Sequence, residues 1–266
     1  MTDITVVILT CNEHLHLTRC LERLAPLEAA QTVVVDSEST DDTRDIALRF
    51  GAKVVVHPWP GNQSEQLNWA IDNLELKTEW ILRLDADEYL TKDSIEWLKQ
   101  NLGTVCENVS ALEFTLERKF MGGTIRYGTN GIKMIRAFRN GHGRYHNMLM
   151  DERIVHDGDK LSVPVVFYDD NLNPMEWWKE KHRKYAVREA KQALADVSID
   201  RRKASYYKLP PYLRVVMYFV LRYVIRGGFL DGAVGWKWHF WQGLWYRWII
   251  DDEIRRLKAE KTHAPK

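Results

Sequence analysis

Residues Ile81–Leu90 read ILRLDADEYL, and this stretch decides the expected fold. An apolar run typical of a buried strand ends in Asp85-Ala86-Asp87-Glu88, which places three carboxylates within four positions. Side chains alternate along a strand, so Asp85 and Asp87 are expected to point the same way. Hard divalent cations bind carboxylate oxygens and complete their shell with water and phosphate. The stretch therefore predicts a metal site at a strand end, with a solvated acidic turn as the alternative.

Three further apolar, β-branched runs precede this strand, and helical patterns separate them. The expected strands are Ile4–Leu9, Thr32–Val35, Lys53–His57 and Trp80–Leu84. The expected helices are Leu15–Leu24, Thr43–Phe50 and Asn62–Leu74. Strands that alternate with helices predict right-handed crossovers and a parallel sheet. Ligands of such sheets bind outside the carboxyl ends of the strands.

Polar clusters follow three of these strands, at Thr10–Glu13, Asp36–Asp41 and Asp85–Glu88. Helix capping or turn formation would explain each cluster singly. Three clusters at one sheet edge instead indicate a ligand site. The chain lacks GxxxxGK[ST] and a GxGxxG after its first strand, which argues against a P-loop and against dinucleotide binding. Asp36 is placed to accept a hydrogen bond from a ring N–H or a ribose hydroxyl.

The overall composition is that of a globular protein. The chain has 266 residues, of which 45% are hydrophobic, and fits one large α/β domain or one domain with an appendage. Cys11, Cys20 and Cys106 form no C-x-x-C pair, so neither a disulfide framework nor a zinc site is expected. The N-terminus lacks the basic region of a signal peptide. These features predict a cytoplasmic location.

The C-terminal region is basic and rich in tryptophan. Residues 201–266 carry 14 Lys/Arg against five Asp/Glu and hold five of the 11 tryptophans. Trp238, Trp241, Trp245 and Trp248 recur at helical spacing as one stripe, and no apolar run reaches the roughly 20 residues that cross a bilayer. We expect helices that lie on an anionic membrane surface, with intramolecular packing or a homo-oligomer contact as alternatives. No nucleic-acid recognition motif accompanies the charge.

Three motifs, taken in order, resemble the family-2 glycosyltransferases of the GT-A fold. They are TxNE (Thr10 to Glu13), VVVDSxSTDxT (Val33 to Thr43) and LDADE (Leu84 to Glu88). The resemblance implies an α/β fold with a Rossmann-like, mostly parallel sheet flanked by helices, followed by the helical, basic, Trp-rich extension. It also implies inverting transfer from a nucleoside diphosphate sugar, usually UDP-linked, with Mn²⁺ or Mg²⁺. Residues 1–170 would form the nucleotide-sugar-binding and catalytic domain.

Residue roles carry over from this resemblance. It implies that the nucleoside is bound by Thr10, Asn12, Glu13 and Asp36. It also implies that Asp85 lies near the ribose or the metal and that Asp87 binds the metal that bridges the diphosphate.

One position departs from the pattern. Many relatives carry Lys or Arg before the residue that corresponds to Asn68, whereas this chain has Leu67. A cation that could neutralise the diphosphate is missing there. The possible substitutes are Arg83, Arg136, Arg139 and Arg153, and the other alternative is that the metal alone suffices.

The second half resembles a subgroup that builds lipopolysaccharide core, capsule or O-antigen. The stretches concerned are 135–141, 150–158, 177–190 and 226–232. The subgroup commonly shows His-Glu where this chain has Asp151-Glu152, so Glu152, and next Asp151, is the expected catalytic base. His142, His146 and His156 are left unassigned.

The subgroup implies an acceptor on a growing bacterial surface glycan that is lipid-linked. Residues 171–266 would then attach the protein to the inner face of the cytoplasmic membrane. Two alternatives stay open: a non-catalytic nucleotide-sugar-binding protein, and a metal-dependent phosphatase of the D-x-D type. In such a phosphatase the first Asp normally ends the first core strand, whereas three strands precede Asp85 here. A nucleotidyltransferase would need a phosphate-binding Gly/Arg/Lys loop after the first strand, which is absent.

Overall fold

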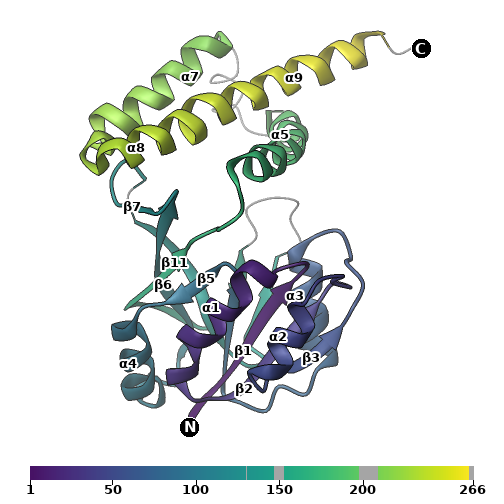
Figure 1. The fold of residues 1–266 in the computed structure, drawn as a ribbon, viewed down its shortest axis with the longest axis vertical. Helices are drawn as coiled ribbons and strands as arrows, with labels where there is room; N and C mark the ends of the chain where they lie inside the picture. The colour runs from purple at the N-terminus through teal and green to yellow at the C-terminus, as the bar shows by residue number, and fades with distance from the viewer. Residues whose placement is uncertain (130, 147–152, 198–208, 264–266) are drawn as a thin grey trace. The chain divides into compact units, whose positions relative to one another are not determined.

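The computed structural model describes residues 1–129, 131–146, 153–197 and 209–263. The chain divides into two compact units (Figure 1). The sheet unit comprises Met1–Lys119 and Gly131–Leu172, and the helical unit comprises Phe120–Asn130 and Asn173–Lys266. The candidate metal and nucleoside residues that the structure describes all belong to the sheet unit.

Four parallel strands form one half of the central sheet, as the sequence predicts. They are β1 (Thr2–Thr10), β2 (Ala29–Asp36), β3 (Lys53–Val56) and β4 (Trp80–Asp85). The strand order of the sheet is β3-β2-β1-β4-β8-β6-β11-β5. β1 pairs in parallel with both β2 and β4, and β2 pairs in parallel with β3. This half of the sheet is therefore an alternating β/α arrangement with β1 at its centre.

The other half of the sheet is mixed. β4 and β6 both pair antiparallel with β8, while β11 pairs in parallel with β6 and antiparallel with β5. The bounds are β5 (Glu88–Leu90), β6 (Val109–Phe120), β8 (Ile132–Arg139) and β11 (Asp159–Asp169). A separate hairpin pairs β9 (Gly143–Tyr145) with β10 (Ile154–His156). The sheet is thus mixed, with its parallel strands on the side that carries the polar clusters.

Helices cover both faces of the sheet unit. They are α1 (His14–Leu24), η1 (Ala25–Leu27), α2 (Thr43–Arg49), α3 (Gln63–Asn73), α4 (Lys92–Asn101) and η2 (Leu102–Thr104). Val6 and Ile8 of β1 pack in the same cluster as residues of α1, α2 and α4, whereas Val7 and Leu9 pack with residues of α3. Because β1 is buried on both faces, its sequence is continuously apolar.

Two of these helices begin at side-chain caps. The Asn62 side chain accepts a hydrogen bond from the Glu65 N–H at the start of α3, and the Thr91 side chain accepts from the Ser94 N–H at the start of α4. Such caps satisfy backbone donors that the first helical turn leaves unpaired. The caps therefore fix where α3 and α4 start, directly after the segments that follow β3 and β5.

The helical unit consists mainly of helices around two small cores. Its elements are β7 (Gly123–Ile125), α5 (Met175–Val197), α7 (Pro211–Phe219), η3 (Val220–Ile225), η4 (Gly228–Asp231), α8 (Gly232–Trp238), η5 (His239–Trp245) and α9 (Tyr246–His263). Ala186 and Ala190 of α5 pack against Tyr246 and Ile250 of α9. Among the described residues, none of the helices is both long enough and apolar enough to span a bilayer.

The expected tryptophan stripe packs largely within the protein. Trp238 is buried at 3% exposure, and Trp241 and Trp245 are partly buried against the same cluster. Only Trp248 of the stripe is exposed, at 45%. Of the three uses open from the sequence, intramolecular packing accounts for most of the stripe.

Candidate active site

The carboxyl ends of β1, β2 and β4 meet at one edge of the sheet. Thr10 is in register with Asp36, and Leu9 is in register with Asp85. The last residues of these three parallel strands therefore lie side by side. This edge is where an open α/β sheet binds its ligands, and we call it the acidic edge.

Asp36 is the most enclosed residue of the acidic edge, with 0% exposure. Its carboxylate accepts hydrogen bonds from Thr10 Oγ1 (3.0 Å), the Ser39 N–H (2.8 Å) and Ser39 Oγ (2.5 Å). A buried carboxylate is tolerated when its oxygens accept hydrogen bonds. Asp36 thereby fixes the first turn after β2 to the end of β1.

Asn12 and Glu13 join the loop after β1 to the loop after β2. Asn12 has a left-handed backbone (φ 57°), and its Oδ1 accepts from the Thr40 N–H at 2.9 Å. Its own N–H donates to Ser39 Oγ, and the Glu13 N–H donates to Thr43 Oγ1. Asparagine tolerates the left-handed region better than most residues. The structure thus brings Thr10, Asn12, Glu13 and Asp36 into one hydrogen-bonded group.

The acidic residues at the end of β4 and just after it have two different roles. Asp85 and Asp87 are partly exposed, whereas Ala86 and Glu88 are buried at 2% and 4% exposure. The Asp85 carboxylate accepts from Arg83 Nη2 at 2.5 Å, and Arg83 Nη2 also donates to Gln63. This alternation leaves two aspartates, and not three acids, available at the edge.

Glu88 points inward as a support for the site. Its carboxylate forms a buried ion pair with Arg136 and accepts from the Asp85 N–H at 2.9 Å. Burial, followed by the nearby charge of Asp85, raises the pKa of Glu88, and Arg83 opposes that shift. Glu88 is therefore a structural group that orients the Asp85 backbone.

Asp87 is held by the segment that follows β11. Asn171 Nδ2 donates to Asp87 Oδ2 at 3.0 Å, and the Asp170 N–H donates to the Asp87 carbonyl at 3.1 Å. Asp170 in turn forms an ion pair with Arg19 of α1 at 2.8 Å. We call residues 169–172 the clasp segment, because it joins Asp87 to α1. The sequence analysis did not identify Asp170 or Asn171 as site residues.

The clasp segment also fixes Glu13 through a buried histidine. His16 is 1% exposed, and its Nε2 accepts from the Leu172 N–H at 2.9 Å. Its Nδ1 lies 2.6 Å from Glu13 Oε2. Because Nε2 accepts, a neutral ring carries its proton on Nδ1 and donates it to Glu13. His16 therefore orients one of the expected nucleoside-binding carboxylates, and like Asp170 and Asn171 it is a residue that sequence reasoning missed.

Gln66 is a further residue that sequence reasoning missed, and it is fully buried where β2 and β3 end. Its Nε2 donates to Ser37 Oγ (3.0 Å) and to the His57 carbonyl (3.2 Å). Its Oε1 lies 2.7 Å from His57 Nδ1. The buried Leu67 and the adjacent Asn68 complete this helix face, and Asn68 bonds to the backbone of Tyr145. These contacts fix α3 against the acidic edge.

The donor set of the acidic edge fits a hard cation. Asp85 and Asp87 offer only oxygen atoms, which Mn²⁺ and Mg²⁺ accept. Within the ranges that the structure describes, no group of three or more His, Cys, Asp or Glu side chains could hold a metal ion. A cation held here would complete its shell from water and phosphate oxygens, which is how these ions usually bind together with nucleotides.

Arginines near the edge are mostly committed elsewhere. Arg136 pairs with Glu88, and Arg139 pairs with Glu79 and donates to the Val109 carbonyl. Of the four expected substitute cations, Arg83 contacts an edge carboxylate, that of Asp85. Arg153 is exposed. Arg83 thus neutralises charge at the edge itself.

The expected bases Asp151 and Glu152 lie outside the described residues. Their flanks are nevertheless placed: Tyr145 pairs with Ile154, and the His146 N–H donates to the Arg153 carbonyl at 2.9 Å. The Arg83 guanidinium lies 5.7 Å from the centre of the Tyr145 ring. Tyr145, the last residue of β9 in this hairpin, therefore lies beside Arg83, which pairs with Asp85.

The unassigned histidines have ordinary partners where they are described. His142 Nδ1 lies 2.9 Å from Asp157, and His156 Nδ1 lies 3.2 Å from Ser110 Oγ. Both are contacts of the β9–β10 hairpin region and not of the acidic edge.

The geometry defines an α/β protein with a carboxylate-rich ligand site at the carboxyl ends of parallel strands. Residues 5–142 match the family described as Glycosyl transferase family 2. This match covers more than half of the chain and includes the strands and loops that build the acidic edge. The chain belongs to Glycosyl transferase family 2.

Curated relatives match part of the chain. An uncharacterised glycosyltransferase of Rickettsia felis is 39% identical over 101 residues, which are 37% of this chain and 34% of the relative. A Rickettsia bellii glycosyltransferase is 41% identical over 98 residues, 36% of this chain and 32% of the relative. A TPR repeat-containing protein of Synechococcus elongatus is 30% identical over 141 residues, 53% of this chain and 32% of the relative. The chain thus matches about a third of the length of these relatives.

Solved structures give a weaker likeness. Glucosyl-3-phosphoglycerate synthase from Mycobacterium tuberculosis, in complex with Mn²⁺, UDP and glucosyl-3-phosphoglycerate, is 23% identical with a TM-score of 0.36. The alignment covers 43% of this chain and 44% of that one. The fold assignment accordingly rests on the sheet topology and on the family match.

Proposed function

We propose that the protein is an inverting glycosyltransferase that uses a nucleoside diphosphate sugar, UDP-linked, as donor. The observation that carries this proposal is the convergence of Thr10, Asp36 and Asp85 at one sheet edge, where Thr10 is in register with Asp36 and Asp85 with Leu9. Family membership supplies the reaction class, and the group formed by Thr10, Asn12, Glu13 and Asp36 is the proposed nucleoside site.

Asp87 and Asp85 are the proposed ligands of Mn²⁺ or Mg²⁺. A bound divalent cation would neutralise the diphosphate as negative charge develops on it. The chain's own part is to hold the two carboxylates in place: Arg83 contacts Asp85, and Asn171 contacts Asp87. Glu88 and Arg136 support the turn from beneath.

Glu152 is the proposed general base, with Asp151 as the second candidate. In a single displacement the acceptor hydroxyl attacks the anomeric carbon from the face opposite the leaving diphosphate, and its proton passes to the carboxylate. Support comes from Tyr145 of the β9–β10 hairpin, whose ring centre lies 5.7 Å from the Arg83 guanidinium, the group that contacts Asp85.

The proposed acceptor is a hydroxyl of a growing, lipid-linked bacterial surface glycan. Such an acceptor fits the motifs of the second half and the basic C-terminal region. It would place residues 171–266 in peripheral contact with the inner face of the cytoplasmic membrane, and residues 1–170 would carry catalysis.

Activity and donor binding must be measured separately to test this proposal. Nucleotide sugars are screened for transfer and hydrolysis with Mn²⁺, with Mg²⁺ and with EDTA. We expect that Asp87→Ala abolishes metal-dependent turnover. We expect that Glu152→Gln lowers turnover and leaves donor affinity unchanged, because its carboxylate serves the acceptor side.

Three outcomes would count against this proposal. Full activity of Glu152→Gln would move the base to Asp151 or elsewhere. Tight donor binding without transfer or hydrolysis under every condition would indicate a nucleotide-sugar-binding protein. A phosphoryl group trapped on Asp85 would indicate a phosphatase.

A further inference from the structure

Helix α7 and segment η3 turn their apolar side chains outward and their arginines inward. The exposed side chains recur in adjacent pairs, four residues apart: Tyr212, Leu213, Val216, Met217, Val220, Leu221, Val224 and Ile225. Arg214 and Arg222 are only 4% and 6% exposed. A helix on the surface of a water-soluble protein normally has the opposite arrangement.

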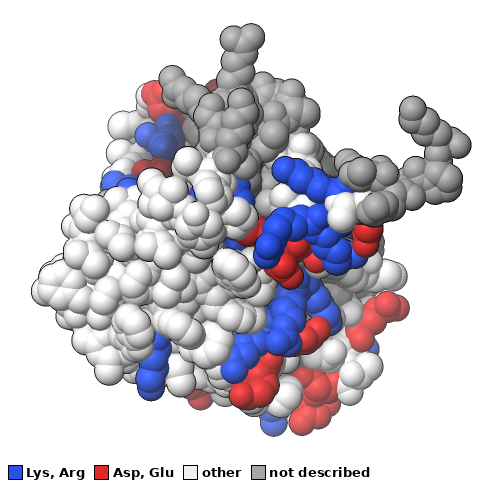
Figure 2. Space-filling model, turned by 90° about the horizontal axis from the view of Figure 1, so that it is seen from above, with Lys and Arg blue, Asp and Glu red and all other residues white. Residues whose placement is uncertain are grey.

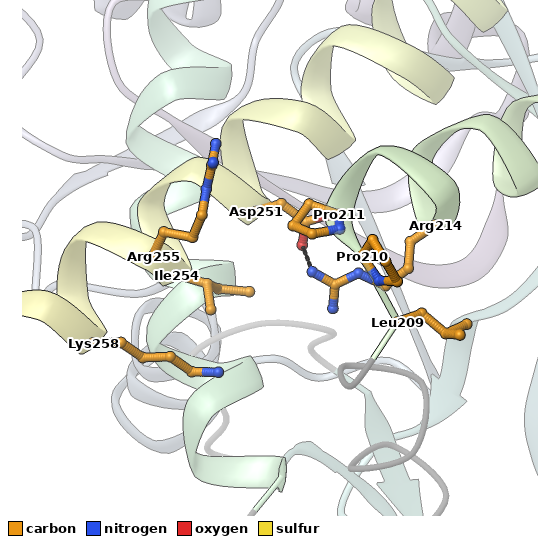
Figure 3. Close-up of a pocket in the computed structure, with 8 residues that line it drawn as sticks. All are labelled: Leu209, Pro210, Pro211, Arg214, Asp251, Ile254, Arg255 and Lys258. Carbon is orange, nitrogen blue, oxygen red and sulfur yellow. Dashed lines mark hydrogen bonds and ion pairs between the residues drawn. The ribbon is translucent and has the colours of Figure 1, made fainter.

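The inward arginines have partners within the helical unit. Arg214 Nη2 donates to Asp251 Oδ1 of α9 at 2.7 Å, and Figure 3 shows its guanidinium directed at that carboxylate. Arg222 Nη1 donates to the Tyr218 hydroxyl at 3.2 Å. Burial of a charged side chain is tolerated when it is paired. The pairing explains why the arginines face inward, and it leaves the outward apolar residues unexplained.

The exposed apolar surface continues from α7 and η3 onto η4 and α8. Ring contacts join them: Phe219 lies 5.8 Å from Trp236, and Tyr223 lies 6.4 Å from Phe229, measured between ring centres. Residues 209–240 hold 13 of the 27 exposed large hydrophobic side chains of the described chain. Figure 2 shows a broad area without charged side chains over this part. We call this surface, spanning residues 209–240, the α7–α8 face.

The α7–α8 face carries more cations than acids. From Leu209 to Phe240 the chain contains a single acid, Asp231. That carboxylate accepts from the Arg126 and Tyr127 N–H groups, both at 3.0 Å. Arg226 and Lys237 are exposed. The surface therefore combines apolar side chains with cations and has no free carboxylate of its own.

We propose that the α7–α8 face lies in the interfacial layer of an anionic phospholipid bilayer. Apolar and aromatic side chains would enter the headgroup–acyl boundary, and Arg226 and Lys237 would contact lipid phosphates. The inference depends on the proposed function in one respect, namely that the acceptor is lipid-linked. Within the C-terminal region that the sequence predicts to meet a membrane, it assigns the contact to the α7–α8 face and not to the Trp238–Trp248 stripe, which is mostly packed inside.

A second copy of the chain fits this face less well. A twofold contact presents the same patch from both partners. Arg226 and Lys237 would then meet an identical cationic patch whose only acid already accepts two backbone N–H groups. An anionic lipid surface offers the missing negative charge.

Vesicle flotation with the full chain tests the inference. The vesicles are phosphatidylcholine alone, and phosphatidylcholine with phosphatidylglycerol. The variants are Ile225→Glu, whose side chain is 72% exposed, and Val216→Glu/Ile225→Glu. The matched control is Leu48→Glu, which is 59% exposed in α2 of the sheet unit. Circular dichroism verifies folding, and multi-angle light scattering gives the oligomeric state.

We expect the wild type and Leu48→Glu to float with the anionic vesicles and not with the neutral ones. Ile225→Glu should lower the vesicle partition coefficient about ten-fold, since an inserted isoleucine is replaced by a charge. Hydrolysis of the donor sugar should be unchanged in Ile225→Glu. If the protein floats with the vesicles but shows no catalysis, that result would contradict the proposed function and leave the membrane inference standing.

Three results would overturn the inference. The first is no flotation of the wild type, or equal flotation on neutral vesicles. The second is equal flotation of wild type and both α7–η3 variants. The third is a wild-type dimer that Ile225→Glu dissociates, because that would assign the α7–α8 face to a second copy.

Discussion

Asp87 depends on a side chain that is far away in the sequence. Asn171 Nδ2 donates to Asp87 Oδ2 at 3.0 Å, and Asp170 of the same segment pairs with Arg19. An amide that donates to one carboxylate oxygen fixes the direction of the other oxygen. Groups that orient metal ligands in this way affect metal affinity although they do not touch the ion. The proposed metal ligand is thus oriented by the clasp segment.

Replacing Asn171 by alanine should weaken metal binding without unfolding the protein. We expect Asn171→Ala to lower Mn²⁺ affinity in the presence of UDP by about 10-fold, because Asp87 loses its orienting donor. Electron paramagnetic resonance of free Mn²⁺ measures this affinity directly. Asn108→Ala is the matched control, since Asn108 donates to Asp159 at 2.7 Å on the exposed surface. Equal affinity in Asn171→Ala and Asn108→Ala would contradict the role of Asn171.

Some residue roles follow from sequence and others do not. The alternation of Asp85 and Asp87 with buried neighbours is local, so strand periodicity predicts it. The inward direction of Glu88 depends on Arg136, 48 positions later, and no local pattern shows it. For Asn171, the sequence does contain a pattern that could have indicated a site residue. Residues 163–171 read VPVVFYDDN, which repeats the pattern of an apolar strand followed by polar residues.

At the scale of elements, the four parallel strands and their helices agree with the sequence to within a few residues. The apolar runs of β1 and β4 and the second half of β2 are buried, and such runs are readable without tertiary information. The helical unit was less predictable. The spacing of Arg214, Arg222 and Arg226 would suit an outward polar face, but Arg214 turns inward because α9 supplies Asp251. Only the tertiary arrangement shows which face is exposed.

The junction between η4 and η5 is tightly packed and should not tolerate a methyl group. A Cβ at Gly228 would lie 2.3 Å from His239 Nε2 and 2.9 Å from the Arg222 carbonyl oxygen. We expect Gly228→Ala to lower the free energy of unfolding of the helical unit by about 1–3 kcal/mol. At Gly103 no heavy atom lies within 4 Å of an added Cβ, so Gly103→Ala is the control. Urea denaturation of both variants measures this difference. Equal midpoints for Gly228→Ala and Gly103→Ala would contradict the tight packing at Gly228.

His239 should make the helical unit sensitive to acid. Burial, and next Arg222, lowers the pKa of His239 from 6.5 to about 4. The unfolded chain therefore takes up the proton first, so stability is complete above pH 6.5 and falls as the pH drops towards 4. The loss is roughly 1.4 kcal/mol by pH 5.5. Urea denaturation at pH 7.5 and 5.5, followed by tryptophan fluorescence, measures it. His239→Phe should reduce the loss of stability between pH 7.5 and 5.5. An unchanged loss in this variant would show that other groups cause it.

At the scale of the whole molecule, the proposed catalytic site and the proposed membrane contact belong to different units. The sheet unit holds the acidic edge, the clasp segment and the family match, which ends at residue 142. The helical unit holds the α7–α8 face. Family membership and sheet topology are established, and the donor, the metal and the acceptor are proposals that share one assumption. That assumption is a divalent cation held by Asp85 and Asp87 together with a diphosphate.

Calorimetric titration of UDP in the presence and absence of Mn²⁺, with wild type and Asp87→Asn, tests this assumption most directly. Asparagine keeps the size of the side chain and removes its charge, so the fold should persist. We predict that wild type binds UDP at least about ten-fold more tightly with Mn²⁺ than without it, and that Asp87→Asn loses this difference. Equal Mn²⁺-dependent UDP binding by Asp87→Asn and wild type would contradict the account.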